Sequence, residues 1–294
     1  KEKKQNDYLV FCSLKRYFRL TPCAMVSILF VALLSKLGLY YNVEAAHIMG
    51  GHNWLSEGGE GRYFSFSSAL YQSLLGIYIG KPSYNGVLWT IYIEFISSIL
   101  LYFFASFYFN KKNLLIISII SIIFLVCLWG EYGVYASLFI IGMLILKGNN
   151  GGSNFLSFLW IFPALFLGSR TQWDTLSIKI TNYLMFFHFN MAAPVHVFMH
   201  GIAAILMVKA IISNKYLMNF FSLKPFVWLG KISFSFYLLH VSILMSAGCW
   251  IFVEISHKGY QQFGAICAFF VTIMFSFIAA SVMTRYVDRP SQKY

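Results

Sequence analysis

Residues 113–129 (NLLIISIISIIFLVCLW) and 133–147 (GVYASLFIIGMLILK) are two apolar runs on either side of a short segment that holds Glu131. A helix that crosses a membrane needs about 20 mostly apolar residues. Six other stretches approach or reach that length, at 22–42, 86–109, 154–169, 194–213, 232–253 and 263–285. The sequence therefore predicts an all-α polytopic membrane protein with about eight transmembrane helices.

The composition of the whole chain agrees with this prediction. Of its 294 residues, 59% are apolar and 11% are charged, and the mean hydropathy is +0.69. Soluble domains contain about 25% charged residues, so this composition excludes a water-soluble enzyme and a disordered chain. The five cysteines occur singly and form no CxxC pair, which argues against a disulfide scaffold and a zinc site.

The distribution of charge predicts the orientation, because cytoplasmic loops carry an excess of Lys and Arg. If the N-terminus is cytoplasmic and all eight helices cross, 16 of the 22 Lys and Arg residues fall on the cytoplasmic side, within 1–19, 111–112, 147, 209–231 and 285–294. We therefore expect a multi-pass protein of the inner (plasma) membrane with both ends in the cytoplasm. The same rule accounts for the net charge of +12, so membrane lipids are expected partners and nucleic acid is not.

Residues 43–85 are predicted to form an external loop. This loop contains the Gly-rich sequence GGHNWLSEGGEGR at 50–62, and its segment 63–80 is apolar but rich in serine. We expect the segment to be interfacial or re-entrant. Residues 1–294 as a whole are expected to form a single membrane domain, since no internal repeat is evident.

Glu94 is an ionisable residue well inside the predicted helix 86–109. Carboxylates within a membrane are costly and often mark functional sites. Thr90, Ser97 and Ser98 lie on the same helical face, at spacings of three or four residues. Glu94 could orient a substrate hydroxyl or act as a base, or it could form a structural pair with a basic residue of another helix. The sequence favours neither interpretation.

Lys15, Arg16 and Arg19 form a basic cluster just before the first predicted span. Because Arg16 and Arg19 are three residues apart on a helix, both guanidinium groups point to one side. Such a pair can bind phosphate groups, or it can anchor the helix at anionic lipid headgroups. The spacing alone favours the lipid interpretation.

Histidines occur in two patterns within the predicted helices. In LGKISFSFYLLH (229–240), Tyr237 and His240 share a helical face, and the histidine can shuttle a proton or, more commonly, bond a neighbouring carbonyl or hydroxyl. His196 and His200 form an HxxxH pair, but the third ligand and the glutamate of a zinc enzyme are missing from the pattern. No metal site is therefore predicted.

Five short motifs resemble those of the acyltransferase-3 family of membrane O-acyltransferases, and they occur in that family's order. KRYFRL resembles its basic RxxR segment, NGVLWTIYIEF its W-[ST]-L-x-x-E helix, and YASLFIIGMLI its F-x-x-G-M helix. LGKISFSFYLLH is similar to LGxxSYxxYLxH, and VDRP to a terminal E-x-P in which Asp288 replaces Glu. Each motif is weak alone, but together they extend along the whole chain.

The resemblance implies a fold of ten helices that moves an acyl group, expected to be acetyl, from acyl-CoA (acetyl-CoA) to a hydroxyl of a carbohydrate or glycolipid. The acyl-CoA is a co-substrate, and neither a bound cofactor nor a metal is implied. The external residues 43–85 would contribute to the choice of acceptor. Roles follow for seven residues: catalysis for Glu94 (orienting) and His240, phosphate binding for Lys15, Arg16 and Arg19, and substrate contact for Trp89 and Tyr237.

The sequence departs from the family in one respect. The family's proposed catalytic histidine lies in its first helix, with ten residues between it and a preceding Arg or Lys. This chain begins with Lys1 and resembles a domain without its first two helices, so we expect the catalytic base upstream, and this fragment alone could be inactive. Lys36 and His47 repeat the spacing as the chain leaves the membrane, so they are not expected to be that pair.

Two other functions are compatible with the sequence. A transporter or exporter of a sugar or lipid-linked substrate would use Glu94 and His240 in its pathway. An inactive acyltransferase-like partner subunit would keep the fold alone. Acyl-CoA-dependent labelling of an acceptor separates catalysis from both.

Overall fold

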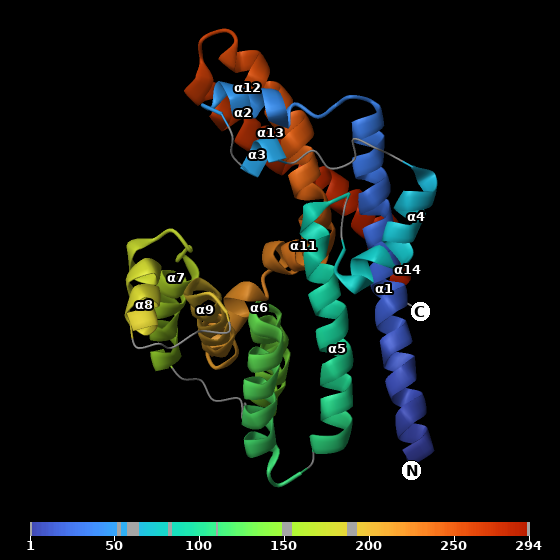
Figure 1. The fold of residues 1–294 in the computed structure, drawn as a ribbon, viewed down its shortest axis with the longest axis vertical. Helices are drawn as coiled ribbons and strands as arrows, with labels where there is room; N and C mark the ends of the chain where they lie inside the picture. The colour runs from blue at the N-terminus through green and yellow to red at the C-terminus, as the bar shows by residue number, and fades with distance from the viewer. Residues whose placement is uncertain are drawn as a thin grey trace. The chain divides into compact units, whose positions relative to one another are not determined.

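The computed structural model describes residues 2–51, 54–57, 65–81, 84–109, 111–148, 155–186 and 193–292. In these ranges the chain forms helices joined by turns, and no strand occurs (Figure 1). The longest helices are α1 (Glu2–Lys36), α5 (Trp89–Tyr108), α6 (Leu114–Gly148), α9 (Val195–Ile212), α11 (Lys224–Ile243) and α13 (Gln261–Met283). The all-α class is therefore confirmed.

Shorter elements connect the long helices. They are α2 (Asn42–Ile48), α3 (Trp54–Glu57), α4 (Phe66–Leu74), α7 (Ile161–Gly168), α8 (Thr175–Phe186), α10 (Lys215–Phe221), α12 (Cys249–Ser256) and α14 (Arg289–Ser291). Three 3₁₀ turns lie at Gly76–Ile79 (η1), Gly86–Leu88 (η2) and Phe155–Trp160 (η3). Two π turns, Leu244–Gly248 (η4) and Thr284–Asp288 (η5), interrupt the long helical runs near the C-terminus.

Among the described residues, six helical runs are long and apolar enough to cross a membrane. They are Phe11–Lys36, Gly86–Tyr108, Leu114–Gly148, Val195–Ile212, Lys224–Ser256 and Gln261–Ser291. A seventh apolar helix, Ser157–Gly168, is shorter. The structure thus supports a multi-pass membrane protein, whereas eight crossings and cytoplasmic ends stay predictions.

The number differs at two places: the apolar helix within 154–169 is short, and α6 contains nearly all of both predicted helices, 113–129 and 133–147. Its backbone leaves the helical region at Gly130, where φ is 57° and ψ is −125°. A Cβ at Gly133 would lie 2.1 Å from the carbonyl oxygen of Leu125, so the two halves approach closely beyond the bend. Leu114 and Ile140 share one apolar cluster, which a straight helix of this length would not allow. The two halves therefore fold back on each other as a hairpin.

The chain forms two compact units. The first contains residues 1–13 and 96–227, and the second contains 14–95 and 228–294. In the first unit, small residues allow close helix packing. The Cβ position of Gly201 is 3.6 Å from side-chain atoms of Val134 and Leu138, and that of Gly168 is 3.6 Å from Ala203. Helix α9 thereby packs against both α6 and α7.

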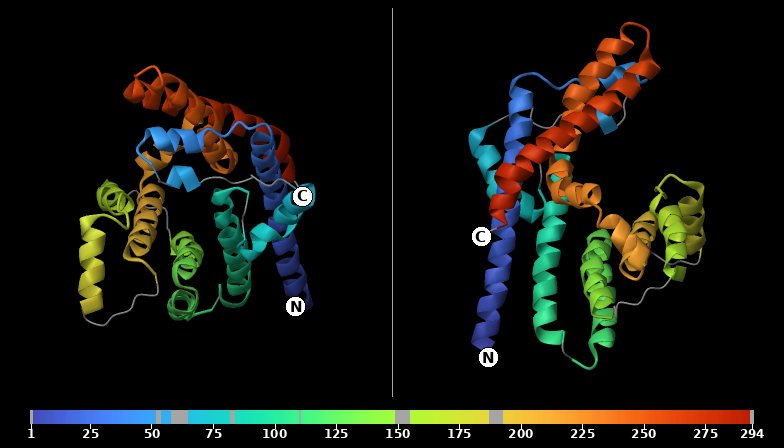
Figure 2. Two further views of the ribbon diagram at one scale, coloured as in Figure 1. Left: turned by 45° about the horizontal axis from the view of Figure 1, so that its top comes forward. Right: turned by 180° about the vertical axis from the view of Figure 1, so that it is seen from behind.

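The second unit joins segments from both ends of the chain. Its largest core combines Leu20 and Ile28 of α1 with Ile77 of η1, Leu88 of η2 and Leu238 of α11, each at most 1% exposed. Helices α12 and α13 lie side by side after a tight turn (Figure 2). Of the segment predicted at 63–80, residues 63 and 64 lie outside the described ranges, and the rest forms α4 and η1. Because Ile77 enters the core, η1 positions the residues around it against α1.

Candidate functional site

Lys15, Arg16 and Arg19 are predicted to lie just before the first membrane span, but in the structure they lie within the apolar part of α1. The apolar stretch of α1 extends from Phe11 to Lys36, and the helix continues through Pro22. Lys15 is exposed, whereas Arg16 and Arg19 are partly buried. The cluster is therefore held on a rigid element, one turn of helix separating the two guanidinium groups.

Arg16 forms an ion pair with Glu94 of α5, through Nη2 and Oε1. The two side chains are 17% and 31% exposed, so the pair is partly screened from solvent. The sequence left open whether Glu94 has a basic partner on another helix, and the structure supplies one. Two residues with separate predicted roles, phosphate binding and orientation, are thus in direct contact.

Aromatic side chains pack around this region. The ring centroid of Tyr78 is 4.9 Å from that of Tyr17 and 4.8 Å from that of Phe95. The Tyr17 hydroxyl donates to the carbonyl of Leu74 at 2.9 Å, and the Tyr78 and Thr21 hydroxyls are 2.8 Å apart. The rings and their hydrogen bonds fix the helical turn that carries Arg16.

Tyr78 was not singled out by the sequence, although it lies beside the ion pair. Burial raises the pKa of its hydroxyl above the usual range, the Thr21 hydrogen bond lowers it, and nearby groups including Glu94 raise it further. The hydroxyl therefore stays protonated at neutral pH. The only sequence signal was a tyrosine within the apolar segment 63–80, which does not distinguish it from a core residue.

Asn85, directly before α5, is a second residue that the sequence did not identify. It is 1% exposed, and its Nδ2 donates to Ser27 Oγ at 2.7 Å and to the carbonyl of Leu238 at 2.8 Å. Its Oδ1 accepts from the backbone N–H of Val87 at 3.3 Å. One side chain thus joins α1, η2 and α11, which fixes the start of the helix that carries Glu94.

Tyr237 and His240 of α11 are both predicted to be site residues, and Tyr237 hydrogen-bonds the start of α5. The Tyr237 hydroxyl donates to the carbonyl of Val87 at 2.9 Å and lies 3.2 Å from Thr90 Oγ1. Glu94 is near enough to interact electrostatically with Tyr237. The structure therefore brings Glu94 and Tyr237 into one region. Trp89, the first residue of α5, is 39% exposed.

His240 bonds its own helix. Its Nδ1 is 2.8 Å from the carbonyl oxygen of Tyr237, and its ring stacks on Phe236 at 5.8 Å between centroids. Since a carbonyl oxygen only accepts, Nδ1 carries the proton. In the neutral ring Nε2 is then an acceptor. This is the commoner of the two environments that the sequence analysis considered.

The C-terminal residues of the second unit contact the basic cluster. Ser291 Oγ donates to the carbonyl of Arg19 at 3.3 Å, and Asp288, 2% exposed, accepts from Gln292 Nε2 at 3.0 Å. The Nε atoms of Arg16 and Arg19 are buried and have no hydrogen-bond partner within the described part of the chain. Buried donors of this kind are normally satisfied, so these two N–H groups are exceptions in this region.

The remaining histidines and Lys36 lie elsewhere. Lys36 ends α1 and His47 lies on α2, and both are exposed. His196 and His200 lie on α9 of the first unit, with ring centroids 5.8 Å apart, and His200 Nε2 bonds the carbonyl of Arg170 at 2.6 Å. His188 lies outside the described residues. No group of three potential metal ligands occurs among the residues that are described.

Comparison with known proteins assigns the family. The chain matches an acyltransferase domain over residues 10–285, which includes four of the five sequence motifs and excludes VDRP at 287–290. No curated protein and no solved structure is significantly similar to it. Because the match extends over most of the chain, this protein belongs to the acyltransferase-3 family of membrane acyltransferases.

Proposed function

We propose that the protein transfers an acetyl group from acetyl-CoA to a hydroxyl of a carbohydrate or glycolipid, as a multi-pass protein of the inner membrane. The family supports acyl transfer in general. The observation that carries the finer proposal is the Arg16–Glu94 ion pair, because it joins a phosphate-binding side chain to a carboxylate within the membrane segments. A donor with phosphates and an acceptor with hydroxyls match these two groups.

Lys15, Arg16 and Arg19 bind the phosphates of the acyl-CoA in this proposal. A guanidinium has five N–H donors and binds phosphate bidentately. Arg16 uses Nη2 for Glu94, and its Nε is buried without a partner. Glu94 therefore holds the guanidinium in one orientation and leaves other donors for the ligand. The exposed ammonium of Lys15 adds a further positive charge at the same turn.

The reaction itself requires a base and an oriented hydroxyl. The acceptor oxygen attacks the thioester carbonyl, its proton passes to a general base, the C–S bond breaks, and the CoA thiolate takes the proton as it leaves. Glu94 orients the acceptor hydroxyl or the base. Among the described residues, Nε2 of His240 is an acceptor in the neutral ring and can take that proton. Trp89 and Tyr237 then border the substrate.

The test measures acyl transfer by the full-length protein in membranes supplied with labelled acetyl-CoA. Arg16→Ala is expected to abolish transfer while the protein remains in the membrane, and Arg16→Lys to raise the KM for acetyl-CoA by about ten-fold because bidentate binding is lost. Glu94→Gln is expected to lower kcat more than it changes KM. Lys36→Gln, at the other end of α1, is the matched control and leaves both values unchanged.

Stability and function are separated by the exchange of the two charges. The double variant Arg16→Glu/Glu94→Arg keeps an ion pair, so it is expected to recover the thermal stability that Arg16→Ala loses but not the transfer. Unchanged transfer in Arg16→Ala would remove the CoA-binding role. If the unaltered full-length protein transfers no acyl group from acyl-CoA, the proposal is wrong and the transporter or partner-subunit interpretation gains weight.

A further inference from the structure

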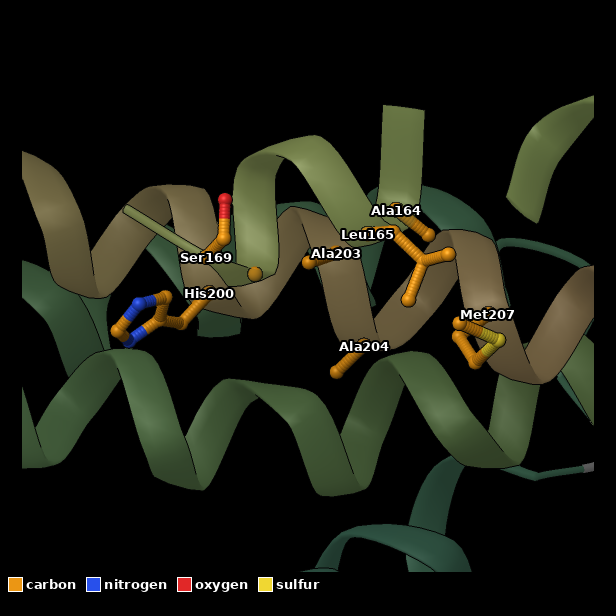
Figure 3. A pocket seen from close by; sticks show the side chains of 8 residues that line it. Ala164, Leu165, Ser169, His200, Ala203, Ala204 and Met207 are labelled. Atoms are coloured by element: carbon orange, nitrogen blue, oxygen red, sulfur yellow. The ribbon is translucent and has the colours of Figure 1, made fainter. Parts of the chain in front are cut away.

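A shallow groove of about 520 Å³ runs along α7 and α9 in the first unit. Most of its lining is apolar: Ala164, Leu165, Gly168, Ala203, Ala204 and Met207. Figure 3 shows Ser169 and His200 at one end and Met207 at the other. Ala164 and Ala203 are buried and form the floor, whereas Leu165 and Ala204 are exposed at the walls. The groove is therefore apolar over most of its length and polar at the end that holds Ser169 and His200.

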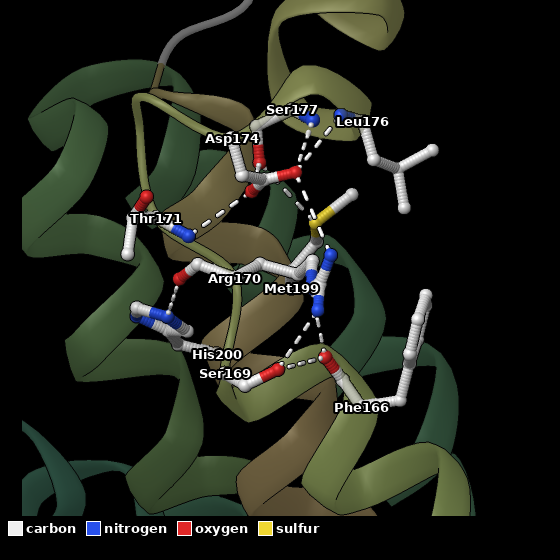
Figure 4. A network of polar contacts seen from close by, with 9 residues as sticks. All are labelled: Phe166, Ser169, Arg170, Thr171, Asp174, Leu176, Ser177, Met199 and His200. Atoms are coloured by element: carbon white, nitrogen blue, oxygen red, sulfur yellow. Dashed lines mark hydrogen bonds and ion pairs between the residues drawn. The ribbon is translucent and has the colours of Figure 1, made fainter.

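Its polar end adjoins a network around Arg170 (Figure 4). His200 Nε2 bonds the carbonyl of Arg170 at 2.6 Å. The guanidinium donates from Nε to the carbonyl of Phe166 at 3.1 Å and from Nη2 to Ser169 Oγ at 3.0 Å, and it lies 4.4 Å from the centre of the Phe166 ring. These contacts fix the cation beside Ser169, a residue of the groove itself.

Asp174 forms an ion pair with this cation but no hydrogen bond. Its Oδ1 is 3.7 Å from Arg170 Nη1, beyond hydrogen-bond distance. Its oxygens accept instead from Ser177 Oγ at 2.8 Å and from the backbone N–H groups of Thr171, Leu176 and Ser177. These donors, the Ser177 hydroxyl first, hold the pKa of Asp174 below its usual value. The carboxylate is thus satisfied by the start of α8, and Arg170 Nη1 keeps its donors.

We propose that this groove binds a membrane phospholipid, with one acyl chain along α7 and α9 and the phosphate at Arg170. The small side chains leave room for a chain and offer it no polar partner. A guanidinium with free donors binds phosphate more specifically than an ammonium does. Within a bilayer, apolar contact alone gives little selectivity, since other lipid tails compete. The headgroup at Arg170 therefore selects the occupant, and no residue of this site has a role in the proposed acyl transfer.

The probe is phosphatidylglycerol with a photoactivatable group on one acyl chain, added to the purified full chain in lipid nanodiscs. After irradiation, labelled peptides are identified by mass spectrometry. We expect the label on 164–169 and 200–207. Unlabelled phosphatidylglycerol is expected to compete, whereas diacylglycerol, which has the chains but no phosphate, is expected to compete about ten-fold less well because it makes no charged hydrogen bond to Arg170.

Two variants test the two halves of the site. Ala204→Phe fills the groove and is expected to reduce labelling of these peptides by about ten-fold, while Ile202→Phe, an exposed position of α9 that does not line the groove, leaves it unchanged. Arg170→Gln is expected to remove the preference for phosphatidylglycerol over diacylglycerol. Lys179→Gln, an exposed charge on α8, is the control for loss of charge.

Label outside the two peptides, or equal label in Ala204→Phe, would overturn the proposal of a lipid in the groove. An unchanged headgroup preference in Arg170→Gln would overturn the assignment of the phosphate to Arg170. If Ala204→Phe does not fold, as judged by gel filtration and thermal unfolding, Ala204→Leu fills less of the groove and is expected to give the same direction with a smaller effect. Absence of label on both peptides in the isolated monomer would also overturn the lipid proposal, and it would favour another protein or a second copy as the occupant.

Discussion

The side chain of Asn85 connects three segments of the second unit. Its amide bonds α1, η2 and α11 at once, and Ser27 Oγ donates to the same Leu238 carbonyl at 2.9 Å. Polar groups this deeply buried are costly unless every partner is present. The alignment of α5, and with it the position of Glu94, therefore depends on a residue outside every predicted catalytic role.

Asn85→Ala is expected to lower the free energy of unfolding in detergent by about 2–3 kcal/mol, because Ser27 and Leu238 lose a buried donor. Asn219→Ala, at an exposed position of α10, is the control and should change it by less than about 0.5 kcal/mol. Chemical or thermal unfolding of both variants provides the measurement. Equal stability of the two variants would mean that the three-way contact contributes nothing.

The pairing of Arg16 with Glu94 also belongs to the residue scale. The sequence identified both side chains as candidates, since each is an ionisable group in or near an apolar run. It did not predict that they meet, because 78 residues separate them. Tyr78 was missed for a related reason: a tyrosine in an apolar segment becomes informative only when its neighbours are known.

Among the elements, the π turn η4 marks a close contact between two long helical runs. A Cβ added at Gly248 would lie 2.3 Å from Thr272 Oγ1 of α13 and 3.3 Å from Leu244 Cδ1. Threonine is β-branched and stiff at χ1, so it cannot move aside freely. The absence of a side chain at Gly248 is what lets the two runs approach.

Gly248→Ala is accordingly expected to destabilise the protein by about 1–3 kcal/mol through overpacking. Gly230→Ala lies in the same helical run but meets nothing within 4 Å, so it should be neutral or stabilising by up to about 1 kcal/mol. Thermal unfolding in detergent distinguishes them. A stabilised Gly248→Ala variant would contradict the close approach of the two runs.

At α6, the sequence predicted two helices and the structure has a hairpin within one long helical run. The hydropathy pattern located both apolar halves, since hydropathy is a local property. The bend at Gly130 requires a positive φ that glycine adopts readily. Whether the halves then continue straight or fold back is decided by the contacts between them, which the pattern does not contain.

For the whole molecule, the orientation in the membrane is the prediction that most needs a test. In a variant without native cysteines, a cysteine at Lys112 is expected to react with a membrane-impermeant maleimide only from the cytoplasm. A cysteine at Glu131 should react only from outside, because the excess of Lys and Arg places 111–112 in the cytoplasm. A cysteine at Lys215 is the cytoplasmic control. If the cysteines introduced at positions 112 and 131 react from the same side, the two halves of the α6 hairpin do not each cross the membrane.

The sequence by itself determined the membrane class, the approximate positions of the apolar helices and the family. Each of these depends on local composition, charge or a short motif, and such properties survive without knowledge of the fold. Only the tertiary structure decided that Arg16 pairs with Glu94, that Asn85 joins three segments, and that the polar end of the groove in the first unit adjoins Arg170. These are contacts between segments far apart in the chain, and their geometry depends on how helices pack, which no single stretch of sequence encodes.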